Sequence, residues 1–386
     1  MSGFGSLLHE DNDDHASLDI YKPIIREASL QGGRLIPIYP ISMTSSAGPF
    51  EFSFPDIPGQ YIHFPSLRLF VEGKVTKADG SNIEDDPKVT TVDNFIASLF
   101  ESCHVDFNGI KVNALSTDHF HFKNFCEVSL SYSRDALSTQ LKTGLKVQDT
   151  AGKHLNFDAN GPLDKRKNFI KGSKTFQGYT FVAADFMIMD RLIPSSHKIS
   201  MKLYRAKDDF SLIKPAAGDD ENYKIEITNI KLYVRYLEVN PSIVQRHLTE
   251  HKNKPQLFPI VKSELKTFQV AQGSQMQNLH NIYRGNLPKT VLVLLMKTAD
   301  YTPNMKKNPF TFPTFQCNHA ALTVNGKKLP YETYTPSLPA TKDGTKFMRE
   351  YRTLFDELAI SYENTVSLFI SGFVKNFHFM FHFRDI

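Results

Sequence analysis

The side chains that could do chemistry are few and far apart in the sequence. His119 and His121 are followed by Glu127, and a His-x-His pair with a nearby carboxylate offers atoms that can bind a metal ion. The favoured interpretation is instead a helix start with partly exposed imidazoles. His378 and His382 lie in a Phe-rich stretch, where a polar strand face is favoured over a metal pair. No metal site is predicted.

Sequence signatures of common enzymes are absent. Ala151-Gly152-Lys153-His154 has no Ser or Thr after its lysine and no correctly spaced upstream glycine, so it does not match a phosphate-binding loop. The chain has no Gly-x-Ser-x-Gly nucleophile elbow and no His-Glu-x-x-His zinc helix. We therefore expect no enzyme activity and no cofactor.

The charge balance argues against nucleic acid as a specific partner. Lys and Arg number 45 and Asp and Glu number 41, and the resulting net charge of +4 is too small to indicate a sequence-specific nucleic-acid binder. The one compact basic run, Lys165-Arg166-Lys167, is interpreted as a solvated loop, with contact to a packaged genome as the alternative.

The cysteines and the apolar runs indicate whether the protein is secreted or inserted in a membrane. Cys103, Cys126 and Cys317 are scattered and odd in number, which fits neither a disulfide framework nor a metal knuckle. The N-terminus lacks the pattern of a signal peptide. The longest plain apolar run, residues 291–296, is far shorter than the roughly 20 residues that a membrane helix needs. We expect a protein without a membrane span that is not secreted through a signal peptide, and that stays in a cell or in a particle assembled there.

Alternation of apolar and polar residues with period two is the main structural signal, and it predicts many half-buried strands. Ile225 and Ile227 lead into Ile230 and Leu232 one residue out of phase, and a β-bulge at Thr228-Asn229 would reconcile the two runs. The other alternating runs are residues 50–54, 67–71, 199–203 and 377–383.

An internal repeat divides the chain into two halves. Asn108-Gly109 and Asn325-Gly326 each lie between two short strand-like runs. An Asn-Gly pair is the strongest local hairpin signal, because a type I′ turn needs positive φ at both central residues. A helical segment follows each hairpin, the first opened by Thr117-Asp118 and the second shown by 3.6-residue spacing over residues 347–358.

The boundaries of these halves follow from stop signals. Asn240-Pro241-Ser242 ends the first half. We expect a mobile N-terminal arm at residues 1–33, a first β-domain at 34–240, a linking helix at 241–254 and a second β-domain at 255–386. Two similar β-rich halves, each with a short helix, indicate tandem sandwiches or barrels.

A series of short motifs runs along most of the chain, over residues 37–373. They are Val92-Asp93-Asn94-Phe95, Ser98-Leu99-Phe100, Asn108-Gly109, Asp149-Thr150-Ala151-Gly152, Arg205-Ala206-Lys207-Asp208-Asp209-Phe210, Arg284-Gly285-Asn286-Leu287-Pro288, Asn308-Pro309-Phe310, Val324-Asn325-Gly326, Arg349-Glu350-Tyr351 and Leu354-Phe355. In this order they resemble the capsid-like proteins of polinton (Maverick) elements and adintoviruses, which are found in animal genomes. Each motif is short, and the order of the series is what makes the resemblance specific.

The resemblance implies an all-β fold of two tandem jelly-roll barrels and a structural role. Such a major capsid protein self-assembles into trimeric, pseudo-hexagonal capsomers of an icosahedral shell inside the host cell. Its partners would be further copies of itself, neighbouring capsomers and a minor capsid protein in the virion, and no residue would act as a catalyst. Relatives continue for about two more strands, so the second barrel is expected to lack its last strands and to be the less stable half, unless the short terminus closes it.

Three other interpretations remain open at this point. A jelly-roll domain could be a binding module for a carbohydrate or for a partner acquired in a host. A single-barrel minor capsid protein is disfavoured by the internal repeat. A cupin-like metalloenzyme would have to be built around His119 and His121, although the spacing and flanking glycines of cupins are absent.

Overall fold

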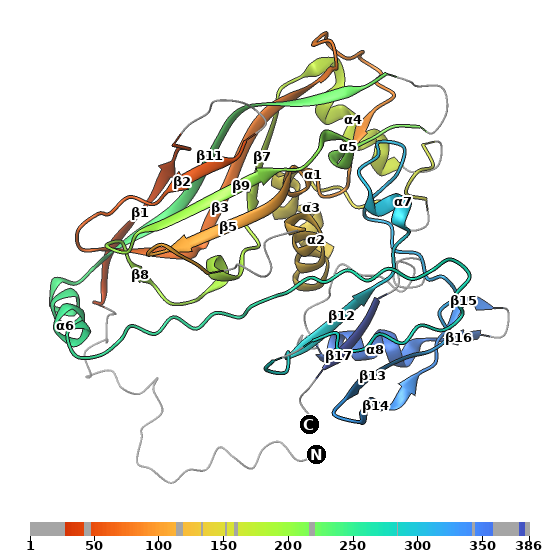
Figure 1. The fold of residues 1–386 in the computed structure, drawn as a ribbon. Helices are drawn as coiled ribbons and strands as arrows, with labels where there is room; N and C mark the ends of the chain where they lie inside the picture. Colours follow the sequence, from red (N-terminus) through yellow and green to blue (C-terminus); the bar gives the residue numbers. More distant parts are fainter. Residues whose placement is uncertain are drawn as a thin grey trace, which may run out of the picture.

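The computed structural model describes residues 28–41, 48–112, 119–132, 134–150, 153–157, 161–215, 221–283, 285–341, 344–357 and 378–382. Antiparallel strands with few helices make up two parts, which a long connection joins (Figure 1). No helix among these residues is long and apolar enough to cross a bilayer.

Two sheets form the first half. Its strands are β1 (Leu30–Ile38), β2 (Phe50–Ser53), β3 (Gln60–Lys77), β4 (Thr90–Thr91), β5 (Phe100–Phe107), β6 (Ile110–Lys111), β7 (Phe176–Phe181), β8 (Ile193–Pro194), β9 (Ile199–Arg205), β10 (Leu212–Ile213) and β11 (Tyr223–Val239). One sheet has the order β1-β11-β3-β7, with β8 also paired to β3, and the other has the order β2-β9-β5-β6, while β4 and β10 form a small ladder. Because Leu30 pairs with Val239, β1 begins inside the arm predicted for residues 1–33.

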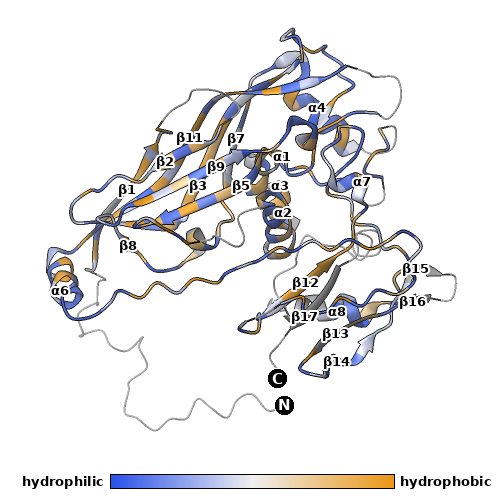
Figure 2. Ribbon diagram, viewed as in Figure 1, coloured by the Kyte–Doolittle hydropathy of each residue, from blue (hydrophilic) through white to orange (hydrophobic). Residues whose placement is uncertain are grey.

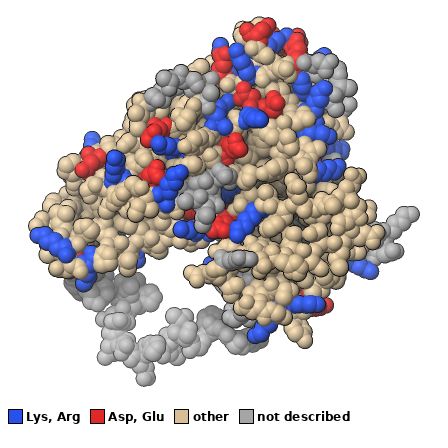
Figure 3. All heavy atoms as spheres, viewed as in Figure 1, with Lys and Arg blue, Asp and Glu red and all other residues tan. Residues whose placement is uncertain are grey.

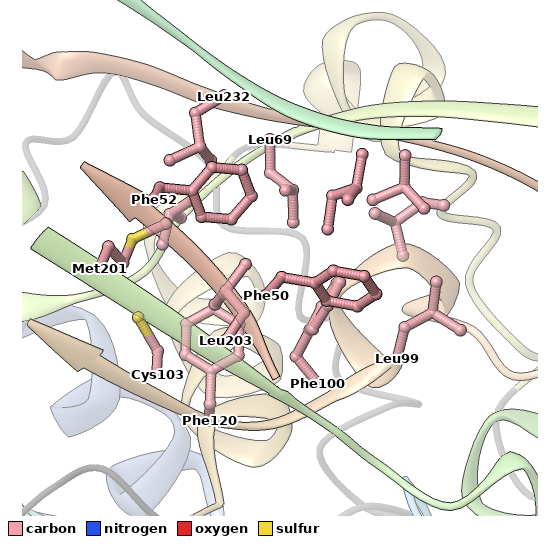
Figure 4. Packing of buried hydrophobic residues seen from close by; sticks show 14 of the residues in the cluster. Phe50, Phe52, Leu69, Leu99, Phe100, Cys103, Phe120, Met201, Leu203 and Leu232 are labelled. Atoms are coloured by element: carbon pink, nitrogen blue, oxygen red, sulfur yellow. The ribbon is translucent and has the colours of Figure 1, made fainter. Parts of the chain in front are cut away.

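The inner faces of the two sheets meet in an apolar core (Figure 4). Phe50 and Phe52 of β2 and Leu203 of β9 pack with Leu69 of β3 and Leu232 of β11, and all five are buried. Burying one such side chain is worth about 1.5–3 kcal/mol, so this layer holds the sheets together. The predicted alternation of apolar and polar residues along the strands is visible in Figure 2.

The longest strand pair confirms the predicted bulge. Ile225 and Ile227 face the core, and so does Ile230, which an unbroken period of two would turn outward. The register between β11 and β3 shifts between Ile227 and Asn229. One extra residue therefore returns the apolar side chains of β11 to the core face.

Short helices cover one end of the first half. They are α1 (Phe95–Ser98), α2 (Phe120–Ser131), α3 (Arg134–Ser138), α4 (Gly161–Ile170) and α5 (Asp208–Ser211), with 3-10 helices η2 (Gln140–Gly144), η3 (Lys171–Ser173) and η4 (Asp185–Ile188). The predicted helix after the first hairpin is α2, and it buries Phe120, Phe122 and Phe125. The predicted opening residues Thr117-Asp118 lie outside the described residues.

The predicted linking helix is α6 (Pro241–His251). The side chain of Asn240 accepts a hydrogen bond from the amide of Ser242, and Pro241 supplies the first helical residue, which together fix the start of the helix. Residues 252–289 follow, and we call them the connection; its described residues, 252–283 and 285–289, contain no helix or strand. They run in an extended course below the first half (Figure 1).

The second half consists of small ladders. Its elements are β12 (Thr290–Leu294), α7 (Thr298–Tyr301), β13 (Ala320–Val324), β14 (Lys327–Tyr334), β15 (Ser337–Thr341), β16 (Gly344–Lys346), α8 (Met348–Glu357) and β17 (His378–His382). Strands pair as β12-β17, β13-β14 and β15-β16. The helix predicted over 347–358 is α8, and the strand predicted over 377–383 is β17. The closure of these strands into a second barrel stays a prediction.

The connection differs from what the sequence predicted, because the second β-domain was expected to begin at residue 255. Pro255 and Pro259 cannot donate main-chain hydrogen bonds, and a polar run over 271–278 has little strand propensity. The first part of the connection also finds its partners on the first half, as described below, instead of in a sheet of its own.

Candidate functional site

The two Asn-Gly pairs form tight turns. Asn108 and Gly109 have φ values of 49° and 83°, and Phe107 pairs with Ile110 across the turn. Asn325 and Gly326 have φ values of 48° and 82°, between β13 and β14. A Cβ atom on either glycine would meet no atom within 4 Å, so the positive φ alone explains why glycine suits these positions.

The surroundings of the two turns differ. The Asn108 side-chain oxygen accepts a hydrogen bond from the amide of Lys198 at 2.9 Å, which ties the first turn to β9. Strand β5 pairs with both β6 and β9, whereas β13 pairs only with β14 among the described residues. The β15-β16 ladder also lies between the second hairpin and α8. The topological equivalence of the hairpins stays a prediction.

His121 of α2 is structural, and the prediction that its imidazole is partly exposed is wrong. His121 is buried, and its Nδ1 donates to the carbonyl oxygen of Phe100 at 3.3 Å while its ring lies 4.0 Å from that of Phe210. Burial lowers the pKa of His121 to about 3, so the ring is neutral. Burial also raises the pKa of Glu127. Within the described part of the chain, no group of three His, Cys, Asp or Glu side chains could hold a metal ion.

The cysteines offer no reactive thiolate. Burial raises the pKa of both Cys103 and Cys126 to about 12, so both thiols stay protonated at neutral pH. Burial also raises the pKa of Cys317. The side chains of His378 and His382 lie outside what the structure describes.

The basic run at 165–167 was predicted as a solvated loop, and that prediction is wrong. The three residues lie in α4, and Arg166 is fully buried. Leu163, Arg166 and Ile170 share the inner face of the helix, which places the guanidinium in the interior. Its Nε and Nη1 donate to the carbonyl oxygens of Thr91 and Val147 at 2.7 and 2.6 Å.

A buried polar cluster joins α4 to the second half. Arg166 Nη2 donates to Asp149 Oδ1 at 2.7 Å. The other carboxylate oxygen accepts from the side-chain amide of Asn308 at 2.9 Å, across 159 residues of sequence. Asn308 is itself fully buried, and its side-chain oxygen accepts from the amide of Phe310 at 3.0 Å. Asp149, Arg166 and Asn308 form the polar part of what we call the junction.

Aromatic rings form the apolar part of the junction. Phe310 stacks on Phe125 of α2 with ring centroids 4.6 Å apart, and it also meets Phe122 and Phe210 edge-on. Tyr301 of α7 stacks on Phe122 at 6.0 Å. The buried members of this cluster are Val92, Phe122, Phe125, Ala206, Phe210, Ile213, Phe310 and Phe312. Two sequence segments far apart therefore share one core.

The connection is anchored to the first half by its inward-facing side chains. His197 Nε2 lies 2.7 Å from Gln256 Oε1, and the Phe258 ring lies 5.7 Å from that of Phe107. The amide of Ser263 donates to Asp185 Oδ2 at 2.9 Å. Since Asp185 is buried, this contact fixes the course of the connection.

Several motifs singled out from the sequence meet at or near the junction. Asp149, Asn308 and Phe210 come from three of them. Asp93 comes from a fourth and forms a buried ion pair with Lys146 at 3.2 Å. The prediction of a solvated loop missed the burial of Arg166. The helical spacing of Leu163, Arg166 and Ile170 is the sequence signal that could have indicated it.

Comparisons with known proteins give structural similarities only. No protein-family model and no curated protein matches the chain. A PBCV-1 virus capsid model shows 12% identity and a TM-score of 0.47, over 94% of this chain and 80% of that one. The Faustovirus major capsid protein shows 9% identity and a TM-score of 0.38, over 63% of this chain. The mavirus major capsid protein shows 14% identity and a TM-score of 0.35, over 74% of this chain.

Two of these matches cover only part of the matched viral protein. The match spans 61% of the Faustovirus protein and 55% of the mavirus protein. The chain therefore spans less than two thirds of the length of each of these two proteins.

Proposed function

We propose that this protein is a structural subunit of a viral-type capsid, of the double jelly-roll major capsid kind seen in polinton and adintovirus-type elements. The observation that carries the proposal is the repeat of an Asn-Gly hairpin followed by a helix in two β-rich halves. The first of these halves is a two-sheet sandwich with a continuous core.

The junction supports a role in a lattice. A subunit with two barrels supplies two similar towers, and three subunits in a ring supply six, which suits a hexagonal array. That geometry needs both halves held in one orientation. The buried Asp149–Arg166–Asn308 cluster and the shared aromatic core provide such a fixed joint.

The proposed activity is self-assembly without catalysis. Its partners are further copies of the chain and a minor capsid protein, and its place is the virion shell. The buried titratable groups of the junction serve as structural ion pairs, which agrees with this role.

A carbohydrate-binding module is a second candidate, favoured by aromatic side chains on the outer face of the first sheet. Phe70 and Tyr179 each pack against Tyr233, at 6.4 and 5.8 Å between ring centroids, and Lys231 lies 4.9 Å from the Phe70 ring. Half-buried rings of this kind occur both at subunit contacts and at ligand sites.

Size-exclusion chromatography with light scattering distinguishes the two candidates. The subunit mass is 43.9 kDa, so a trimer has about 132 kDa, three times that value. We expect the purified chain to elute as this trimer at micromolar concentration. A stable 43.9 kDa monomer at all concentrations would contradict the capsid proposal and favour the binding module.

A further inference from the structure

One face of α6 and the connection combines apolar and basic side chains exposed to solvent. Leu248, Leu257 and Val261 are 56%, 69% and 82% exposed. Arg246 and Lys252 lie beside them along the chain, and Lys and Arg side chains also appear at the lower left of Figure 3, where α6 lies in Figure 1. We call this surface, from residue 246 to residue 266, the basic face.

The basic face carries charge that the described residues do not neutralise. Over residues 246–266 five Lys or Arg residues and two Glu residues give 5 − 2, or +3. Glu250 forms an ion pair with Lys254 at 3.1 Å, and Glu264 forms one with Lys266 at 3.6 Å. Arg246, Lys252 and Lys262 form no ion pair with any described residue, so this surface is complementary to an anionic partner.

Contacts between the connection and the first half fix the basic face in the unbound protein. Side chains of the connection alternate: Gln256, Phe258 and Ile260 turn toward the first half, and Leu257 and Val261 turn to solvent. The inward row is fixed by the contacts of Gln256 with His197 and of Phe258 with Phe107, and the main-chain amide of Ser263 is held by Asp185. The outward row therefore forms a preorganised apolar stripe flanked by cations.

The N-terminal segment has the opposite character. Residues 1–27, which lie outside the described residues, contain six Asp or Glu and two Lys or Arg, and so carry 2 − 6, or −4. Five of the acidic residues fall between residues 10 and 19, a stretch with no Lys or Arg. The apolar residues Leu7, Leu8, Leu18 and Ile20 flank this acidic run.

The N-terminal segment also joins the described chain beside the basic face. Asn240, the residue that caps α6, donates from its main-chain amide to Ser29 at 2.9 Å and from its side chain to the carbonyl oxygen of Ala28 at 3.2 Å. Asp14 is 14 residues before Ala28, which allows a reach of about 46 Å at about 3.3 Å per residue. Helix α6 is only about 16 Å long at 1.5 Å per residue.

We propose that residues 1–27 bind the basic face of their own chain. The acidic run pairs with Arg246, Lys252 and Lys262, and the flanking apolar residues cover Leu248, Leu257 and Val261. The tether at Ala28 makes binding within one chain the favoured case, because it gives a high effective concentration. A second basic surface, on α4, lies at the opposite end of the first half in Figure 1, and none of the residues of α4 is an exposed large apolar one. This inference does not depend on the capsid proposal.

Carbodiimide cross-linking of the full chain, read out by mass spectrometry, tests the contact directly. At low salt we expect zero-length links from Glu10, Asp11, Asp13 or Asp14 to Lys252 or Lys262, in species of monomer mass. Links from these carboxylates mainly to lysines of α4 or of the β13-β14 hairpin would overturn the proposal. So would links to the basic face found only in species of dimer mass, or none at all.

Charge reversal gives a second, independent test. We compare the full chain with the variant R246E/K252E/K262E and with the matched control K327E/K328E, whose lysines are exposed at the β13-β14 turn. The readout is the rate at which chymotrypsin cuts after Tyr21, a site common to all three chains. We expect cleavage about tenfold faster in the first variant, as for loss of several exposed ion pairs, and an unchanged rate in the control. Raising the salt to about 1 M should speed cleavage of the unchanged chain similarly. Equal rates in all three chains at low salt would overturn the proposal.

Discussion

Replacing Asp149 by Asn is expected to lower the free energy of unfolding by about 3–5 kcal/mol. The change keeps the shape of the side chain but removes the carboxylate that, among the described residues, pairs with the fully buried guanidinium of Arg166. A buried cation without its counter-ion is costly, because its charge is then left unbalanced in the low-dielectric interior. The new amide also cannot accept from Arg166 and Asn308 with both of its polar atoms. Chemical denaturation followed by circular dichroism measures the effect.

Two matched variants give this prediction its control. Asp164→Asn removes an ion pair with Lys167 in the same helix as Arg166, but Asp164 is 63% exposed, so we expect a change below about 0.5 kcal/mol. The double variant D149L/R166M should cost less than D149N alone, because it leaves no unpaired charge. If D149N lowers the free energy of unfolding as little as D164N does, the junction does not depend on the Asp149–Arg166 pair.

The same pair predicts a particular pH dependence. Burial alone would raise the pKa of Asp149, but the charge of Arg166 and the contact with His154 outweigh it and lower the pKa to about 2. The ordinary value is 3.8. A pKa lowered in the folded state gives stability that is complete above the unfolded value and is lost as the pH falls through the folded one. The unchanged chain should therefore lose this contribution between about pH 4 and about pH 2, and D149N should not.

Replacing Phe310 by Ala is expected to loosen the joint between the two halves. Phe310 is 2% exposed and touches the rings of Phe122, Phe125 and Phe210, so truncation leaves a cavity at the centre of the shared core. Such a change typically costs about 3–5 kcal/mol. Because Leu265 of the connection and Leu294, Met296 and Tyr301 of the second half pack against this core, we expect proteases to cut residues 267–289 much faster in the variant while the first half stays resistant.

Phe315→Ala serves as the control for this variant. Phe315 lies five positions further along the same loop and is 52% exposed, so its truncation should change neither stability nor cleavage noticeably. Equal cleavage of the Phe310 and Phe315 variants would show that the aromatic cluster does not join the halves.

Local features were predictable from the sequence because they depend on neighbours in the chain. The Asn-Gly turns follow from the φ values that those residues tolerate, and the bulge between Ile227 and Asn229 follows from the change of phase. The linking helix follows from Asn240 and Pro241. The predicted jelly-roll pairing of residues 255–386 depends on long-range contacts, and it remains a prediction.

The junction was not predictable, because it depends on where distant segments meet. Nothing near Arg166 in the sequence shows that Asp149 and Asn308 surround it. The run Lys165-Arg166-Lys167 is polar by composition, and packing of α4 against β4 buries its arginine but not the two lysines. Likewise, the course of the connection is set by His197 and Asp185 of the first half.

Electron microscopy of the purified full chain tests the central claim most directly. The capsid proposal predicts particles with threefold symmetry whose top views show six similar towers in a hexagonal outline, two from each copy. The two towers of one copy should lie at a constant spacing, since the junction fixes the halves. Particles of one copy without symmetry, or assemblies with one tower per copy, would contradict the account.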